Sequence, residues 1–355
     1  MEPAKKQPTI KDVASASGVS IQTVSRVINN RPDVADKTRE RVKKVIKEIG
    51  YQPSALARSL IRQESLTLGI VTAGLKFLGP SRTLNGITGE AEEAGYSLLL
   101  KELPNFNATD IVPIINEFRS RHVDGIIWAA PEIGDNRKWI DEFLDKLNMP
   151  VVYLTMEPRE GISVIAVDNY KGGELAVNHL LESHYSKIGH IAGPLDWWES
   201  CQRFKAWKEI VERSQNMDAD KYWTEGNWSS RSGAKAMAEL FEKAPDIDAV
   251  FVANDQMALG ALSVIRSRGL RVPEDIGIVG FDNTAESEFF NPALTTIQHD
   301  HIQVGNLAVR ETIRIIDAIQ NDQKPEYRVN MLEPNLLVRE SSIRCKEEEV
   351  TEKRN

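Results

Sequence analysis

The sequence has few of the residues that build redox sites and no segment that could cross a membrane. Its two cysteines, Cys201 and Cys345, exclude a CxxC zinc or redox site, and we predict no metal site and no cofactor. No run of about 18 apolar residues occurs, which excludes a transmembrane helix. Lys5 and Lys6 have no apolar run after them, so we expect no signal peptide and a cytoplasmic protein.

The common enzyme motifs are missing as well. The sequence contains no GxSxG elbow, no HExxH, no P-loop and no GxGxxG. Its 52 Asp and Glu residues include no spaced pair that stands out from a solvated face. We therefore predict no catalytic residues, and an enzyme is kept only as an alternative class.

Charge is distributed unevenly along the chain. Residues 1–64 carry a net charge of +6, with 13 Lys and Arg against 7 Asp and Glu, whereas the rest of the chain carries −14. A basic N-terminal module on an acidic body favours attraction of that module to phosphate groups.

The basic module contains two short predicted helices joined by a tight turn. Thr9 is a suitable N-cap for a helix over 10–17, Gly18 ends that helix, and Ser20 caps the next one. Apolar residues of both helices would pack together: Ile10, Val13, Ala14, Val24, Val27 and Ile28. This spacing is typical of a helix-turn-helix motif.

The outward face of the second helix carries groups that can read DNA. Its residues are Ile21, Gln22, Ser25, Arg26 and Asn29. Gln pairs with adenine and Arg with guanine in the major groove, while Ser and Asn suit phosphate oxygens. The alternative is an ordinary helical hairpin with a solvated polar face.

Two further helical segments follow. The apolar stripe over 36–49, with Gly50 after it, predicts a third helix. Residues 53–61 could form a helix of two turns, which is too short to be stable in isolation. This segment would therefore fold only when docked, and it is a candidate switch.

After Leu66, short apolar strands alternate with helices. A second series of strands is predicted to begin near Ser163. Such alternation predicts an α/β fold with two doubly wound parallel-sheet subdomains beside the all-α headpiece. Ligands of open parallel sheets bind at the carboxyl ends of the strands, so the polar strand ends should face a shared cleft.

Several motifs match one family in order across nearly the whole chain. They include KDVASASGVSIQTVSRVIN, GYQPSALARSL, HIAGPL, VANDQMALGAL and GLRVPEDIGIVGFDN. The chain thus resembles the lactose-repressor (LacI/GalR) family of bacterial transcriptional regulators. The resemblance implies a core like that of the periplasmic sugar-binding proteins. It also implies a dimer that reads a pseudopalindromic DNA operator under the control of a small molecule.

The resemblance also assigns the DNA contacts. Ile21, Gln22 and Arg26 would read the major groove, with Ile21 limited to an apolar contact such as a thymine methyl. Thr9, Ser20, Ser25 and Asn29 would contact the DNA backbone. In a hinge helix, Ala57 would face the minor groove and Leu60 would wedge into the central base step. The alternative for Leu60 is the start of the first core strand.

The family pattern likewise implies the effector contacts: Phe77, Ser81, Arg203, Trp228, Asn254 and Asp282. Asp accepts from two hydroxyls, Arg donates in a fork and Asn does both, a combination that suits a sugar. Trp228 would lie against an apolar sugar face. In the alternative interpretation, Asp282 only caps a segment and Trp228 only fills the core.

This chain departs from the family's type member around the predicted cleft. Thr155 replaces an acidic residue, and Trp197 and Trp198 replace small polar ones. We add Thr155 and Trp197 to the six predicted effector residues, which makes eight. The two Trp residues predict either an aromatic platform for a glycoside or ordinary packing. Lactose is therefore disfavoured as the effector, and His299 and His301 are assigned no role.

We predict a homodimeric repressor of carbohydrate-utilisation genes that a sugar or glycoside releases from its operator. A corepressor-dependent repressor and a sugar-binding receptor are alternatives, and the basic headpiece argues against the receptor. The charged tail has no leucine heptad, which favours a dimer over a tetramer.

The predicted domains are the headpiece 1–52, the hinge 53–64, the core 65–345 and the tail 346–355. Within the core, the N-subdomain comprises about 65–166 and 297–326, and the C-subdomain about 167–296 and 327–345.

Overall fold

A computed structural model describes the chain in segments. The described residues are 8–29, 31–51, 65–104, 111–131, 133, 147, 149–215 and 218–344. The chain divides into two compact units, with the division after Leu66. The predicted hinge helix over 53–61, including Ala57 and Leu60, and the tail 346–355 lie outside the described residues. Within the described part, every helix is too short or too polar to cross a bilayer.

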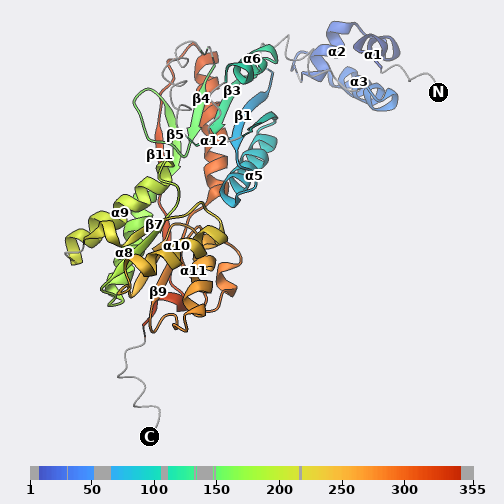
Figure 1. Ribbon diagram of the computed structural model, residues 1–355. Coiled ribbons are helices and arrows are strands. Elements are labelled where there is room, and N and C mark those ends of the chain that lie inside the picture. Colours follow the sequence, from blue (N-terminus) through green and yellow to red (C-terminus); the bar gives the residue numbers. More distant parts are fainter. Residues whose placement is uncertain are drawn as a thin grey trace. The chain divides into compact units, whose positions relative to one another are not determined.

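The first unit is a three-helix headpiece with the predicted bounds (Figure 1). Its helices are α1 Ile10–Ser17, α2 Ile21–Ile28 and α3 Asp36–Ile49. The Ser20 hydroxyl caps α2 by accepting from the Thr23 N–H at 3.1 Å. Gly18 ends α1 with a φ of 65°, which glycine adopts without a steric cost. The helices share a small buried core of Val13, Ala14, Val24, Val27, Val34 and Val42.

The second unit begins with a parallel sheet in the strand order β11-β5-β4-β3-β1-β2. Its strands are β1 Thr67–Ala73, β2 Ser97–Leu103, β3 Gly125–Ala129, β4 Val151–Leu154, β5 Ser163–Val167 and β11 Val329–Leu332. Helices α5 Leu78–Glu93 and α12 His301–Gln320 cover one face, and α6 Val112–Ser120 covers the other. This sheet and its helices form the N-subdomain.

The second sheet has the order β12-β10-β9-β8-β6-β7, and its strands are parallel except for β12. They are β6 Ile188–Ala192, β7 Trp223–Glu225, β8 Ala249–Val252, β9 Gly277–Phe281, β10 Thr295–Gln298 and β12 Asn335–Leu337. Helices α8 Asn169–Glu182 and α9 Trp198–Gln215 cover one face, and α10 Ser230–Lys243 and α11 Asp255–Ser267 cover the other. Short 3-10 helices occur at Ala219–Lys221, Ser287–Phe289 and Glu340–Ser342. These elements form the C-subdomain, and the predicted fold class is confirmed.

The chain passes between the two subdomains at three places. It crosses from β5 to α8, from β10 to α12 and from β11 to β12. Each crossing takes only a few residues, since β5 ends at Val167 and α8 begins at Asn169. The two subdomains are therefore joined by short connections beside one another in the fold (Figure 1).

The subdomain limits differ from those that the sequence predicted. Val329–Leu332 does not belong to the C-subdomain. The predicted limit near residue 166 does place Ser163–Val167 correctly in the N-subdomain, but the second series of strands does not begin there. Both strands lie in the first sheet, where β5 pairs with β4 on one side and with β11 on the other. Ile297 and Gln298 belong to β10 in the second sheet rather than to the N-subdomain. Strand order depends on pairing between distant segments, which local patterns do not encode.

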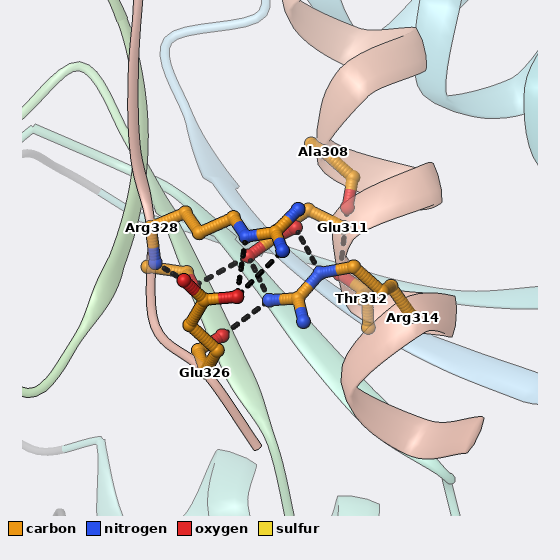
Figure 2. A network of polar contacts seen from close by, with 7 residues as sticks. Ala308, Glu311, Thr312, Arg314, Glu326 and Arg328 are labelled. Carbon is orange, nitrogen blue, oxygen red and sulfur yellow. Dashed lines mark hydrogen bonds and ion pairs between the residues drawn. The ribbon is translucent and has the colours of Figure 1, made fainter. Parts of the chain in front are cut away.

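A buried carboxylate explains why β11 joins the first sheet (Figure 2). Glu311 on α12 is buried and accepts hydrogen bonds from the Ser163 hydroxyl at 2.7 Å and from Arg314 at 2.7 and 2.8 Å. Arg314 also donates to the carbonyl of Glu326, and the N–H of Arg328 donates to the Ser163 hydroxyl at 3.0 Å. The segment that leads into β11 is thereby held beside β5, because a buried carboxylate needs hydrogen-bonding partners.

Two glycines of α5 test how closely α5 packs on α12. A Cβ at Gly86 would lie 2.1 Å from the carbonyl oxygen of Ile302, whereas a Cβ at Gly89 would meet nothing within 4 Å. We expect Gly86→Ala to lower the free energy of unfolding by about 1–3 kcal/mol because of overpacking. Gly89→Ala on the same helix should raise it by about 0.5–1 kcal/mol. Chemical denaturation of both variants measures this, and equal effects would contradict the close contact.

Candidate functional site

A cavity of about 750 Å³ lies between the two subdomains, at the carboxyl ends of their strands. Seven of the eight predicted effector residues line it: Phe77, Thr155, Trp197, Arg203, Trp228, Asn254 and Asp282. Phe77 precedes α5 and Thr155 follows β4, whereas Asp282 follows β9. Both subdomains therefore contribute to one cleft, as the strand-end argument predicted.

Ser81, which the sequence predicted as an effector contact, lies away from the cavity. Several residues that do line the cavity were not predicted from the sequence. Ser81 does not line the cavity, because it lies within α5 and its hydroxyl donates to the carbonyl of Leu75. The lining residues that the sequence did not predict include Lys76, Thr83, Glu199, Asn227, Gln256 and His301. Glu199 directly follows Trp197 and Trp198 in the sequence, and this position beside the predicted cleft is the sequence signal that points to it.

Arg203 is the buried cation of the cleft. Its guanidinium donates to the Asn169 side chain at 2.8 Å and to the carbonyl of Ala253, which follows β8. The same group lies over the Phe281 ring, 3.5 Å from the ring centroid. Burial lowers the pKa of Arg203, while the nearby carboxylates, Asp282 first, oppose that shift. A guanidinium stays charged even so, and Arg203 thus sets a fixed positive charge in the cleft wall.

Asp282 supplies the matching negative charge. Burial alone would raise its pKa, but the hydrogen bond from His299 and the charge of Arg203 hold the pKa below its ordinary value. The His299 Nε2 lies 3.1 Å from the Asp282 Oδ1. Asp282 is therefore an ionised hydrogen-bond acceptor at neutral pH.

Asn254 acts as a helix cap as well as a lining residue. Its Oδ1 accepts from the Met257 N–H at 2.9 Å, at the start of α11. Its amide nitrogen donates to the carbonyl of Trp228 at 3.1 Å and to Gln256 at 2.9 Å. Both amide donors already have protein partners, so Asn254 also positions the backbone of Trp228.

The aromatic residues divide between the cleft and the core. Trp197 packs edge-on against Trp228, with ring centroids 5.6 Å apart. Trp228 comes so close to Gly193 that a Cβ there would lie 2.2 Å from the indole ring. Trp198, in contrast, packs against the buried core of the N-subdomain. Of the two predicted interpretations of the Trp pair, Trp197 fits a cleft surface and Trp198 fits packing.

Three lining residues have left-handed backbone. The φ angles are 53° at Thr155, 70° at Trp228 and 104° at Asp282. Residues other than glycine adopt such angles at a cost of about 1–3 kcal/mol each, and they concentrate at functional sites. This clustering of strained backbone supports a binding role for the cleft.

Glu199 and Asp255 are carboxyls with raised pKa values close to this site. Burial raises the pKa of Glu199 to about 7, and its Oε2 is buried without a hydrogen-bond partner among the described residues. Burial and the neighbouring Asp282 raise the pKa of Asp255 to about 7. Asp255 accepts from the Thr296 hydroxyl at 2.7 Å and from the Thr284 N–H at 2.8 Å, so its role is structural.

The outward face of α2 in the headpiece is arranged largely as predicted. Ile21 and Gln22 are exposed, and Ile21 leaves 44% of its surface accessible. Arg26 is exposed and lies 3.5 Å from the carboxylate of Asp33. Ser25 and Asn29 are less exposed than predicted, because the Asn29 amide donates to the Ser25 carbonyl at 2.8 Å. Thr9 and Ser20 stand at the N-termini of α1 and α2.

Comparison with known proteins gives matches over most of the chain. The lacI family of bacterial regulatory proteins matches residues 9–54, and the periplasmic binding protein-like domain matches residues 177–342. The HTH-type transcriptional regulator CelR of Thermobifida fusca is 34% identical over 352 residues, which cover 95% of this chain and 99% of CelR.

Solved structures agree with these matches. The structure of the Lac repressor dimer bound to operator and the anti-inducer ONPF has a TM-score of 0.84 and 30% identity. That match covers 95% of this chain and 100% of the other. The CelR–cellobiose complex has a TM-score of 0.69 and 31% identity, and it covers 94% of this chain and 100% of the other.

The raised pKa of Glu199 predicts a pH-dependent effect of its substitution. The unfolded carboxyl ionises near the ordinary glutamate pKa of 4.5, whereas the folded one keeps its proton up to about pH 7. The Glu199 carboxyl therefore lowers the stability of the wild-type chain over this range, by up to about 1.4 kcal/mol per pH unit, and Glu199→Gln removes this contribution, whereas that of Asp255 is the same in both proteins. Denaturant unfolding of both proteins between pH 4 and pH 8 should give a difference that grows up to about pH 7 and then levels off. A difference that is independent of pH would contradict the assignment.

Proposed function

Because this chain belongs to the LacI family of bacterial regulatory proteins and is a DNA-binding transcriptional regulator, we propose that it represses carbohydrate-utilisation genes. A sugar or glycoside would bind the cleft and release the repressor from its operator. The single observation that carries this proposal is the cleft itself, in which an ionised Asp282 and a buried Arg203 lie beside Trp197 and Trp228. We further propose a cytoplasmic homodimer on a pseudopalindromic operator.

The chemistry of the cleft suits a carbohydrate. A sugar ring offers hydroxyl groups that both donate and accept, and apolar C–H faces that lie against aromatic rings. Asp282 would accept from hydroxyls and Arg203 would donate to them, while Trp228 would contact a ring face. The volume of about 750 Å³ is in the range of ordinary small-molecule sites. That the related CelR forms a complex with cellobiose supports an oligosaccharide as the effector.

The headpiece would supply the sequence recognition. Gln22 and Arg26 would contact base edges in the major groove, and Ile21 a thymine methyl group. Thr9 and Ser20 would position the headpiece on phosphates through the N-termini of α1 and α2. Ser25 and Asn29 would contribute phosphate contacts at the other end of α2, and Ala57 and Leu60 would enter the minor groove.

The effector would act through the arrangement of the two subdomains. Cleft residues come from both subdomains, and the chain crosses between them at three short connections. A ligand shifts a conformational equilibrium only by the difference between its affinities for the two states. A sugar that contacts Phe77 on one side and Asp282 on the other would favour one spacing of the subdomains. Release of the operator would follow when that spacing no longer supports the hinge residues 53–61.

The assignment of Arg26 as a base reader predicts a sequence-dependent loss. Arg26→Ala should weaken binding to the operator by roughly 1–3 kcal/mol, or about 5- to 150-fold, and should scarcely change binding to random DNA. Folding should be little affected, because the Arg26–Asp33 pair is exposed. Fluorescence anisotropy with both DNAs at one salt concentration measures this. Equal losses on both DNAs would sink the assignment.

The role of Asp282 predicts loss of the effector response. Asn has the size of Asp and tolerates positive φ, so Asp282→Asn preserves the backbone. Loss of a charged hydrogen bond costs about 1.5–3 kcal/mol, so the half-saturating concentration should rise more than tenfold while operator binding stays intact. The test uses cellobiose and a panel of other disaccharides. Asp196→Asn, an exposed acidic residue beside the cleft that does not line it, is the matched control. An unchanged response in a folded Asp282→Asn protein would refute the role.

A further inference from the structure

Asp282, His299 and His301 bring three metal-binding side chains together beside the cleft. One ligand atom from each, a carboxylate oxygen or an imidazole nitrogen, lies within 4.8 Å of the others. His299 and Asp282 already approach to 3.1 Å, and the two imidazole rings have centroids 4.1 Å apart. The residues come from the end of β9, the end of β10 and the start of α12, so the sheet edge and the subdomain crossing place them together.

The hydrogen bonding of these rings is incomplete. Nδ1 of His299 and Nε2 of His301 are buried and have no hydrogen-bond partner among the residues that the structure describes. The His299 side chain is 3% exposed, so solvent does not satisfy it. Buried polar atoms without partners are uncommon in folded proteins, and an ion is one of their recognised explanations. Nε2 of His301 is thus available to an ion, and the unpartnered Nδ1 of His299 leaves that ring held only through its Nε2, the atom that faces Asp282.

The charges around Asp282, His299 and His301 are compatible with a divalent cation. Arg203 would repel it, but Asp282 carries a negative charge and the carboxyls of Glu199 and Asp255 interact with the charges of this cluster. A bound cation is therefore compensated by acidic groups that are already in place.

We propose that Asp282, His299 and His301 bind a divalent transition-metal ion, with zinc as the best-fitting ion. Mixed imidazole and carboxylate ligands suit zinc, and tetrahedral bonds of about 2.0–2.2 Å place the ligand atoms about 3.4 Å apart. Nε2 of His299 and Oδ1 of Asp282 are already 3.1 Å apart, so an ion that replaces the proton between them would take both as ligands after small side-chain movements. Three protein ligands leave a fourth position open.

The site adjoins the proposed effector cleft. Asp282 and His301 line both the cleft and an adjoining cavity of about 530 Å³, which His299 also lines. A metal ion held by Asp282 would withdraw the carboxylate that accepts effector hydroxyls. Zinc should therefore raise the half-saturating effector concentration. This consequence rests on the proposed function, whereas the metal site itself does not.

Metal titration of the tag-free, chelator-treated full chain tests the site without sugar or DNA. Calorimetry with ZnCl₂ should show one tight site per chain, and CoCl₂ should give the visible absorption of a cobalt ion with nitrogen ligands. His299→Asn and His301→Asn should each weaken zinc binding by at least about 10- to 100-fold, the loss caused even by removing an outer-sphere partner. His122→Asn is the matched control, because His122 is exposed and its positive φ also suits Asn.

The outcomes separate the two proposals. If the wild-type chain binds neither zinc nor cobalt, or if both folded His variants bind zinc as the wild type does, the metal site is refuted. Circular dichroism establishes the fold of each variant, and the two independent His variants guard against the misfolding of one. Metal binding that persists when no sugar elicits a response would leave the site intact and count against the effector proposal alone.

Discussion

The buried guanidinium of Arg203 is the constraint on which the cleft depends. A positive charge removed from water must be compensated by hydrogen bonds and opposite charge. Arg203 therefore draws together the Asn169 side chain at one subdomain crossing, the Ala253 carbonyl after β8 and the Phe281 ring at the end of β9. Because Ala253 and Phe281 stand at the ends of the neighbouring strands β8 and β9, one charged side chain on α9 ties the edge of the second sheet to the crossing at Asn169.

The other half of the site is coupled to the crossings between the subdomains. Asp282 accepts from His299, which stands at the crossing from β10 to α12, and α12 packs on the first sheet. Glu311 on the same helix binds Ser163 and holds the segment that leads to β11. The polar contacts of the cleft are thus linked through α12 to those that hold the connections between the subdomains. A ligand that alters the cleft acts where the two subdomains are joined.

Several residues combine a structural role with a place in the cleft. Asn254 caps α11 and positions Trp228 while its side chain lines the cavity. Trp198 stabilises the N-subdomain core from the first turn of α9, and its neighbour Trp197 faces the cleft. A residue at such a position can therefore pack against the protein and contact a ligand at the same time. Cleft walls need rigid support, and the same hydrogen bonds that form a helix cap also provide that support.

The sequence alone determined the features that depend on local chemistry. The helix bounds from Thr9 to Gly50 followed from caps, glycines and apolar spacing, and the alternation of strands and helices followed from their periodicity. The effector residues came from family motifs, and the tertiary structure brought seven of the eight to one cavity. Only the tertiary structure decided the subdomain of β11 and of Ile297 and Gln298, the raised pKa of the buried Glu199 and the approach of His299 to Asp282. These features depend on pairing, burial and contact between residues that are distant in the sequence, and such long-range geometry leaves no local pattern to read.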